Sequence, residues 1–285
     1  MRDFVVMCDV NGDVLPQYAE QEDIKIFPQY YHFNDGIIYG DEIKLDAETF
    51  FARIKGGERA YSMGCNPERV RGIMEEALKA EHDIIIIMAS SQCSGSYNTV
   101  CAEAAELLED YPEARIHVVD SYLESTPLGF LAYFAQEMKK QGKSFDEVTD
   151  FLEKKKDHMN CFFIVDDLSC LVRGGRLSAI GGAVGTMLNI KPILCERDGL
   201  IAAFAKARGK KAAKQMIIEE LKKMDLDLSI GAVVDAVAYE ECEQFGEEIT
   251  EKTGMQILWH TQLNPTIGAH TGPGAIGVVY CTKDR

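Results

Sequence analysis

The chain has 285 residues, of which 46% are hydrophobic and 27% are charged, as is ordinary for a folded globular protein. This composition excludes collagen, a single long coiled coil and disorder throughout. Lys and Arg number 30 against 46 Asp and Glu, which gives a formal net charge of −16. Because so acidic a surface repels the phosphates of nucleic acids and anionic lipids, we expect no nucleic-acid partner.

The apolar segments of the sequence are short. The longest run, at residues 84–89, is far below the ~20 residues of a membrane-spanning helix. The N-terminal run at residues 4–8 is too short for the core of a signal peptide. The 9 cysteines are scattered without a C-x-x-C pair, which indicates reduced thiols. We therefore expect a cytoplasmic protein with no membrane segment, no metal and no cofactor.

The first part of the chain alternates predicted strands and helices. Strands are predicted at residues 4–8, 24–33, 36–39 (as a hairpin return), 84–88 and 116–119. Helices are predicted at 46–54, from 66 onward, at 95–108, 127–140 and 144–156. Asn66 and Pro67 are typical of a helix start. Such alternation predicts a parallel sheet covered by helices.

The second part has an α+β pattern. Strands are predicted at 161–165, 191–195, 200–205, 229–234, 255–259 and 276–281, helices at 209–223 and 240–253, and between them a loop at 166–178 and a small-residue segment at 179–188. We therefore predict an α/β protein with two domains, residues 1–158 and residues 159–285. A cleft between them is the expected place for a small molecule.

A serine-rich loop follows the strand predicted at 84–88 and runs into a helix. Ligands of open α/β sheets bind beyond the carboxyl ends of strands, and a helix N-terminus attracts anions. Ser94, Gly95 and Ser96 are therefore candidates for an anion site, with plain helix capping by Ser94 as the alternative. Ser62, in a second polar turn, can add another hydroxyl, although capping is the simpler interpretation of that turn alone.

Two further segments carry candidate side chains. Arg173 and Arg176 flank two glycines, and guanidinium groups suit carboxylate or phosphate. Three roles stay open for them: ligand contact, partner contact, and pairing with Asp166 and Asp167 inside the loop. The glycine-rich segment 267–277 predicts a turn before the last strand that presents His270 to an anion.

Taken in order, these motifs resemble the DegV family of fatty-acid-binding proteins. The resemblance rests on S-S-x-x-S-G-S-Y at 90–97, V-D-S at 119–121, D-D-L-S-x-L-x-R-G-G-R at 166–176 and I-G-x-H-x-G-P-G-A-I-G at 267–277. It spans nearly the whole chain. Three features depart from the family pattern at the ligand end: Val10 in place of a serine after Asp9, the turn at 62–65, and Cys93 in place of a leucine.

The resemblance implies a two-domain fold with one long-chain fatty acid in a tunnel between the domains. It places the carboxylate at Ser62, Ser94, Gly95, Ser96 and His270, and makes Arg173 and Arg176 candidates for carboxylate or partner contact. It also implies that the chain is a non-catalytic carrier. Such a carrier presents the fatty acid to a dihydroxyacetone-kinase-like subunit of a fatty acid kinase, which supplies ATP.

Two other functions are compatible with the same residues. Ser94, His270 and one of Asp9, Asp120 or Asp166 can be interpreted as the triad of an esterase-like hydrolase. Against this, the sequence has no G-x-S-x-G motif. The other alternative is a regulator that binds a small anion or a nucleotide.

Overall fold

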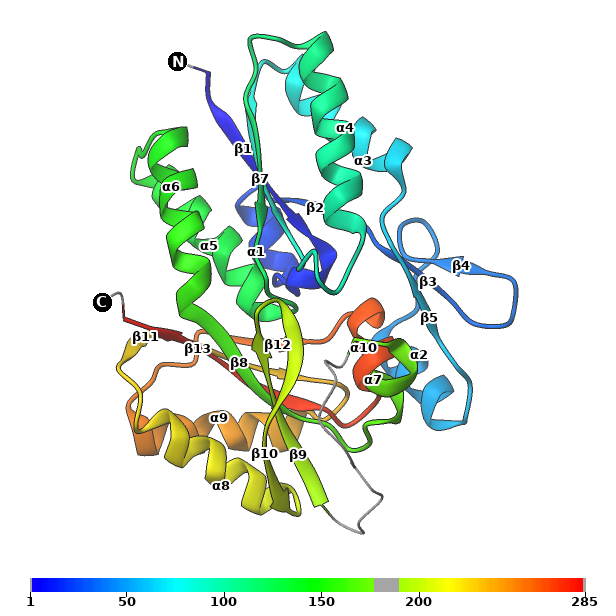
Figure 1. Ribbon diagram of the computed structural model, residues 1–285, viewed down its shortest axis with the longest axis vertical. Coiled ribbons are helices and arrows are strands. Elements are labelled where there is room, and N and C mark those ends of the chain that lie inside the picture. Colours follow the sequence, from blue (N-terminus) through cyan, green and yellow to red (C-terminus); the bar gives the residue numbers. More distant parts are fainter. Residues whose placement is uncertain (1, 177–189, 284–285) are drawn as a thin grey trace.

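The computed structural model describes residues 2–176 and 190–283, and within these ranges the chain forms three β-sheets (Figure 1). The first is parallel, with the order β2-β1-β6-β7, and consists of β1 (Phe4–Asp9), β2 (Lys25–Phe27), β6 (Asp83–Met88) and β7 (Ile116–Asp120). The second is antiparallel, with the order β4-β3-β5, and consists of β3 (Tyr30–His32), β4 (Ile38–Tyr39) and β5 (Tyr61–Met63).

The third sheet is mixed and has the order β10-β9-β8-β13-β11-β12. Its strands are β8 (Met159–Ile164), β9 (Ile190–Arg197), β10 (Leu200–Arg208), β11 (Leu226–Asp235), β12 (Trp259–Gln262) and β13 (Ile276–Thr282). The pair β11–β12 is parallel and the other pairs are antiparallel. A parallel sheet followed by a mixed one confirms the predicted α/β class.

The helices lie between and around these sheets. They are α1 (Pro16–Gln21), α2 (Ala47–Lys55), α3 (Pro67–Lys79), α4 (Ser96–Asp110), α5 (Thr126–Lys140), α6 (Phe145–Lys155), α7 (Ser169–Gly174), α8 (Lys210–Leu221), α9 (Tyr239–Thr253) and α10 (Pro265–Thr271). None of the helices in the described ranges is both long enough and apolar enough to cross a bilayer.

The fully buried strand β6 explains the layering of the parallel sheet. Its isoleucines alternate between the two faces, as period-2 strand geometry requires. Ile84 and Ile86 pack with α3 and α4, whereas Ile85 and Ile87 pack with α1, α5 and α6. Burial on both faces is typical of parallel strands.

Helix α5 belongs to the cores of both larger sheets. Its side chains share one hydrophobic cluster with β1 and β6 on one side and with β8, β11, β12 and β13 on the other. The ring of Phe130 stacks on Trp259 of β12 with 4.7 Å between centroids. On the far face of the six-stranded sheet lie α8 and α9 (Figure 1). Helix α5 therefore fixes how the two sheets sit against each other.

The predicted helix starts are confirmed by their caps. Asp46 accepts from the Thr49 N–H at 2.7 Å, and Asn66 accepts from the Arg69 N–H at 3.1 Å. Ser144 forms a capping box with Glu147. Each side chain satisfies backbone donors that a helix leaves unpaired in its first turn.

One predicted strand is wrong. Residues 24–33 form two strands in different sheets, β2 and β3. Between them lies Pro28, which has no N–H to donate to a ladder. The side chain of the next residue, Gln29, turns inward, and its Nε2 donates a hydrogen bond to Oδ2 of buried Asp9 at 2.7 Å. The chain therefore leaves the parallel sheet at Pro28.

Other corrections concern short elements. The predicted loop at 166–178 contains α7, and the polar turn at Ser62 is part of strand β5. His270 lies on α10 and not in a turn, although the turn that follows is shaped by Gly272 and Gly274, both with positive φ. The strand predicted at 255–259 begins only at Trp259. The segment 179–188 lies outside the described residues.

Candidate functional site

A cavity of about 330 Å³ lies where the sheets meet. Its wall comes from strands of the six-stranded sheet, from loops that follow strands of the parallel sheet, from strand β5 and from α10. The loop before α4 is one of these loops. Most of the surface is apolar, with Phe163, Leu171, Ile201, Val234 and Leu263 among the contributing residues. The volume is at the small end of the ~300–1,000 Å³ usual for small-molecule pockets.

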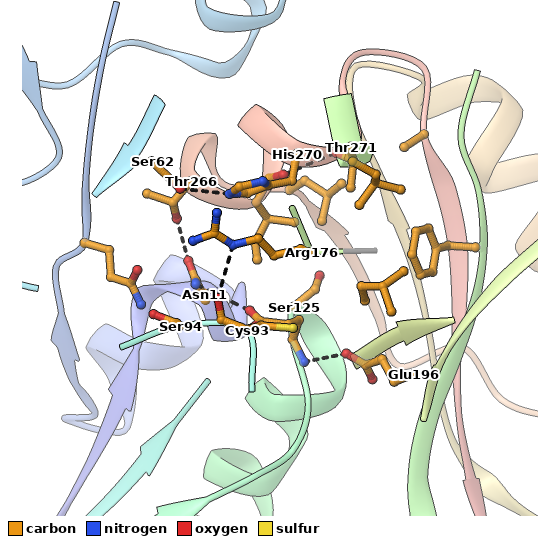
Figure 2. A pocket seen from close by; sticks show the side chains of 18 of the residues that line it. Asn11, Ser62, Cys93, Ser94, Ser125, Arg176, Glu196, Thr266, His270 and Thr271 are labelled. Carbon is orange, nitrogen blue, oxygen red and sulfur yellow. Dashed lines mark hydrogen bonds between the residues drawn. The ribbon is translucent and has the colours of Figure 1, made fainter. Parts of the chain in front are cut away.

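Ser62 and His270 meet at one end of this cavity (Figure 2). Ser62 Oγ and His270 Nε2 are 2.8 Å apart although the residues are 208 positions apart in the sequence. Strand β5 carries the serine, and α10 carries the histidine. The fold therefore unites two of the predicted carboxylate contacts.

The His270 side chain is half-buried, and its ring is neutral near pH 7. Burial lowers its pKa to about 4, and the nearby positive charge of Arg176 lowers the pKa further in the same direction. Its Nδ1 is buried without a hydrogen-bond partner among the described residues. A neutral imidazole carries one N–H, so it can donate one hydrogen bond to an anion.

The position of His270 depends on how α10 is held. Asn264 caps α10 by accepting from the Thr266 and Ile267 N–H groups. The Asn264 side chain in turn donates to buried Asp13 at 2.8 Å. A Cβ on Gly174 of α7 would lie 2.1 Å from His270 Nδ1, so only glycine allows this packing.

The serine loop lies beside Ser62. Ser94 Oγ donates to Ser96 Oγ at 3.1 Å, and Ser96 Oγ also accepts from the Cys65 N–H at 3.1 Å. The Ser96 N–H is held within the loop by Ser94 Oγ at 3.2 Å. Gly95 is the N-cap residue of α4. Ser62, Ser94, Gly95, Ser96 and His270 all line the cavity.

The two arginines of the R-G-G-R segment take different positions. Arg176 lines the cavity, and its Nε donates to the Cys93 carbonyl at 3.2 Å (Figure 2). Arg173 is exposed, and its Nη2 contacts Cys170 Sγ at 3.2 Å. A second hollow of about 110 Å³ shares Ser62, Arg176 and His270 with the cavity and adds Arg173. Arg173 therefore lies outside the cavity but next to its polar end.

The acids of that segment do not pair with these arginines. Asp166 contacts Lys191 Nζ at 2.9 Å, and Asp167 accepts from the Ser169 hydroxyl at 2.6 Å. Asp166 and Asp167 therefore do not form the ion pairs with Arg173 and Arg176 that were one of the three roles considered.

The described residues do not form the hydrolase triad of the alternative interpretation. His270 contacts Ser62 and not Ser94, and its Nδ1 lacks the acid that would orient it. Asp120 instead accepts from the Ser91 N–H at 3.1 Å, and Asp9 from the Asn11 N–H at 2.9 Å.

Two acids on the cavity wall, half-buried Glu124 and buried Glu196, were not predicted as site residues from the sequence. Glu124 precedes α5, and Glu196 lies on β9; the Glu124 N–H donates to Glu196 Oε1 at 2.5 Å. Burial raises the pKa of Glu196 to about 8 and the pKa of Glu124 well above its usual range. The sequence offered one signal for Glu196: it directly follows the apolar run at 193–195, so it continues a predicted buried strand.

Comparison with known proteins identifies the family. A family model described as "Uncharacterised protein, DegV family" matches residues 3–283. The chain belongs to the DegV family. A DegV domain-containing protein of Clostridium perfringens is 32% identical over 287 residues, which cover 98% of each chain.

Solved DegV structures share the fold. DegV of Bacillus subtilis, described as a fatty acid binding protein, has a TM-score of 0.86 at 29% identity and covers 99% of this chain and 100% of its own. A DegV family protein of Thermus thermophilus, described by its fatty acid binding, has a TM-score of 0.87 at 25% identity with the same coverage. Both of these relatives are thus described as binding fatty acids.

Proposed function

We propose that this DegV protein binds a long-chain fatty acid in the cavity, between a domain of residues 1–158 and a domain of residues 159–285. The fatty acid carboxylate accepts hydrogen bonds from Ser62, Ser94 and His270 and from the N–H groups that begin α4. The observation that carries the proposal is the Ser62–His270 contact at one end of a mostly apolar cavity.

The chemistry of the cavity suits such a ligand. Each buried CH₂ group of an acyl chain contributes ~0.8 kcal/mol, so an apolar wall suffices for tight binding without a covalent bond. Hydroxyls and a neutral imidazole N–H then orient the carboxylate, and Arg176 supplies a positive charge nearby. The fatty acid binding described for the relatives from B. subtilis and T. thermophilus supports the proposal.

Substitution of the two contacts tests this assignment. His270→Ala and Ser62→Ala should each weaken fatty acid binding by roughly 10- to 100-fold, because each removes a hydrogen bond to a charged group. Displacement of a fluorescent fatty acid by palmitate measures the effect. His117→Ala is the control, since His117 contacts Glu153 and does not line the cavity. Unchanged affinity in both variants would contradict the assignment.

The protein itself is then a carrier without catalysis of its own. It presents the carboxylate to a dihydroxyacetone-kinase-like subunit that transfers phosphate from ATP. Arg173, exposed beside the polar end of the cavity, is placed to contact that subunit or the phosphoryl group.

Arg173→Ala separates presentation from binding. We expect it to lower acyl phosphate formation by about tenfold or more in a reaction with the kinase subunit and ATP, because one charge-assisted contact is lost. The dissociation constant for palmitate should stay unchanged, because Arg173 does not line the cavity. If Arg173→Ala and the wild type form acyl phosphate at equal rates, Arg173 does not contact the kinase subunit or the phosphoryl group.

A further inference from the structure

The cavity wall contains a polar pair that a fatty acid carboxylate at Ser62 and His270 does not use. It consists of the carboxyl groups of Glu124 and Glu196, which both line the cavity. Glu124 lies in the loop between β7 and α5, and Glu196 lies on β9 of the six-stranded sheet. In Figure 2 Glu196 is drawn well apart from Ser62 and His270. We call Glu124 and Glu196 the carboxyl pair.

One oxygen of the carboxyl pair, Glu196 Oε2, lacks a full hydrogen-bond partner. Glu196 is 6% exposed, and its Oε2 is buried with no hydrogen-bond partner among the described residues except the weakly donating Cys161 thiol nearby. Within the described part of the chain, Glu124 Oε2 accepts one long hydrogen bond, at 3.5 Å from the side-chain amide of Asn11. Buried polar atoms are normally bonded, so Glu196 Oε2 has capacity left for a ligand.

The surroundings make this arrangement costly without a ligand. Phe163, Ile201 and Val234 line the same cavity. A carboxyl group placed among apolar side chains loses its hydration and regains it only through a hydrogen-bonding partner. An unsubstituted acyl chain offers no such partner, because its CH₂ groups neither donate nor accept.

We propose that Glu124 and Glu196 form a second polar subsite that binds a hydroxyl group on the acyl chain, so that the ligand is a hydroxylated fatty acid. This inference rests on the proposed function and specifies its substrate class. The hydroxyl donates to Glu196 Oε2 and accepts from the protonated carboxyl of the pair.

The charge state of the carboxyl pair favours a hydroxyl over an ammonium group. Burial raises the pKa of both carboxyl groups, and the negative charges of Asp9 and Glu196 raise the pKa of Glu124 further. Arg176 acts in the opposite direction on Glu124, so a positive charge is already close. A pair that retains a proton matches a group that both donates and accepts.

A panel of ligands tests the subsite on the full chain. Octadecanoic acid is compared with hydroxyoctadecanoic acids that carry the hydroxyl at successive carbons, and with an amino-substituted analogue. At least one hydroxylated isomer should bind about tenfold more tightly than octadecanoic acid, as one or two buried hydrogen bonds would produce. The Glu124→Leu/Glu196→Leu variant should lose this preference.

Three controls keep the test specific. Glu124→Gln/Glu196→Gln should retain a preference for the hydroxyl, because an amide also donates and accepts. Asp83→Asn removes a buried acid outside the cavity and should leave the preference unchanged. Thermal unfolding confirms that each variant is folded; if the leucine variant is not, single Glu196→Leu and Glu124→Leu variants replace it.

The outcomes separate the two proposals. If octadecanoic acid binds as tightly as every hydroxylated isomer, or if the leucine variant keeps the preference, the subsite is overturned and fatty acid binding stands. Tighter binding of the amino analogue also overturns it, in favour of a cationic ligand. If none of these acids binds, the proposed function itself fails.

Discussion

At the level of single residues, burial drives the ionisable groups of the cavity toward their neutral forms. The pKa of His270 falls to about 4, while the pKa of Glu196 rises to about 8. Both shifts have the same first cause, which is that a charged group loses hydration in an apolar wall. Near neutral pH these two side chains are therefore uncharged, although the chain as a whole carries −16.

The Glu196 shift predicts how stability depends on pH. Its folded pKa lies above the unfolded value of 4.5, so the folded state binds more protons and stability falls as pH rises from 4.5 to about 8. Glu196→Gln keeps an oxygen for the Glu124 N–H but does not ionise. At pH 9 it should raise the free energy of unfolding by roughly 2–4 kcal/mol, as measured by denaturant titration.

The same titration contains its own control. At pH 4 the wild-type Glu196 is protonated, so the Gln variant and the wild type should have similar stability there. A variant that is less stable than the wild type at pH 9 would show that Glu196 is stabilised as a carboxylate.

At the level of elements, the contact between α7 and α10 positions the histidine. Gly174 of α7 faces His270, and a Cβ on Gly268 of α10 would lie 2.7 Å from the Phe51 ring of α2. Two glycines thus let α10 approach neighbours on both sides. From the sequence alone, the glycines around His270 predict only a turn.

Gly174→Ala tests this packing. Its Cβ would overlap His270 Nδ1, so the ring or the helix must move. We expect a loss of roughly 1–3 kcal/mol in the free energy of unfolding and weaker fatty acid binding. Gly72→Ala is the matched control, because Gly72 lies in α3 with open space at its Cβ, and alanine there should stabilise by up to ~1 kcal/mol. Equal stability of the Gly174 variant and the wild type would contradict the packing argument.

The short elements could be predicted from the sequence only in part. Asn66 and Pro67 correctly predicted the start of α3, and Asn264 and Pro265 carry the same signal for α10. The second pair was missed because the glycines that follow suggested a turn. Strand β5 has only three residues, too few for an alternating pattern to appear.

At the level of the whole molecule, long strands and long helices could be predicted because each carries its own periodicity. The isoleucine run of β6 and the spacing of α5 are examples. The carboxyl pair could not be predicted in this way, because Glu124 and Glu196 are 72 positions apart in the sequence. Only the packing of both sheets on α5 brings them together. Ser62 and His270 were predicted to act together only through the family resemblance.

The central claim is that this DegV protein carries a fatty acid, and native mass spectrometry of the freshly purified chain tests it most directly. Solvent extraction and lipid analysis of the same sample identify whatever is bound. The account predicts a mass excess of one fatty acid per chain, reduced in His270→Ala. A chain that is free of ligand and takes up neither added palmitate nor a hydroxylated fatty acid would contradict it.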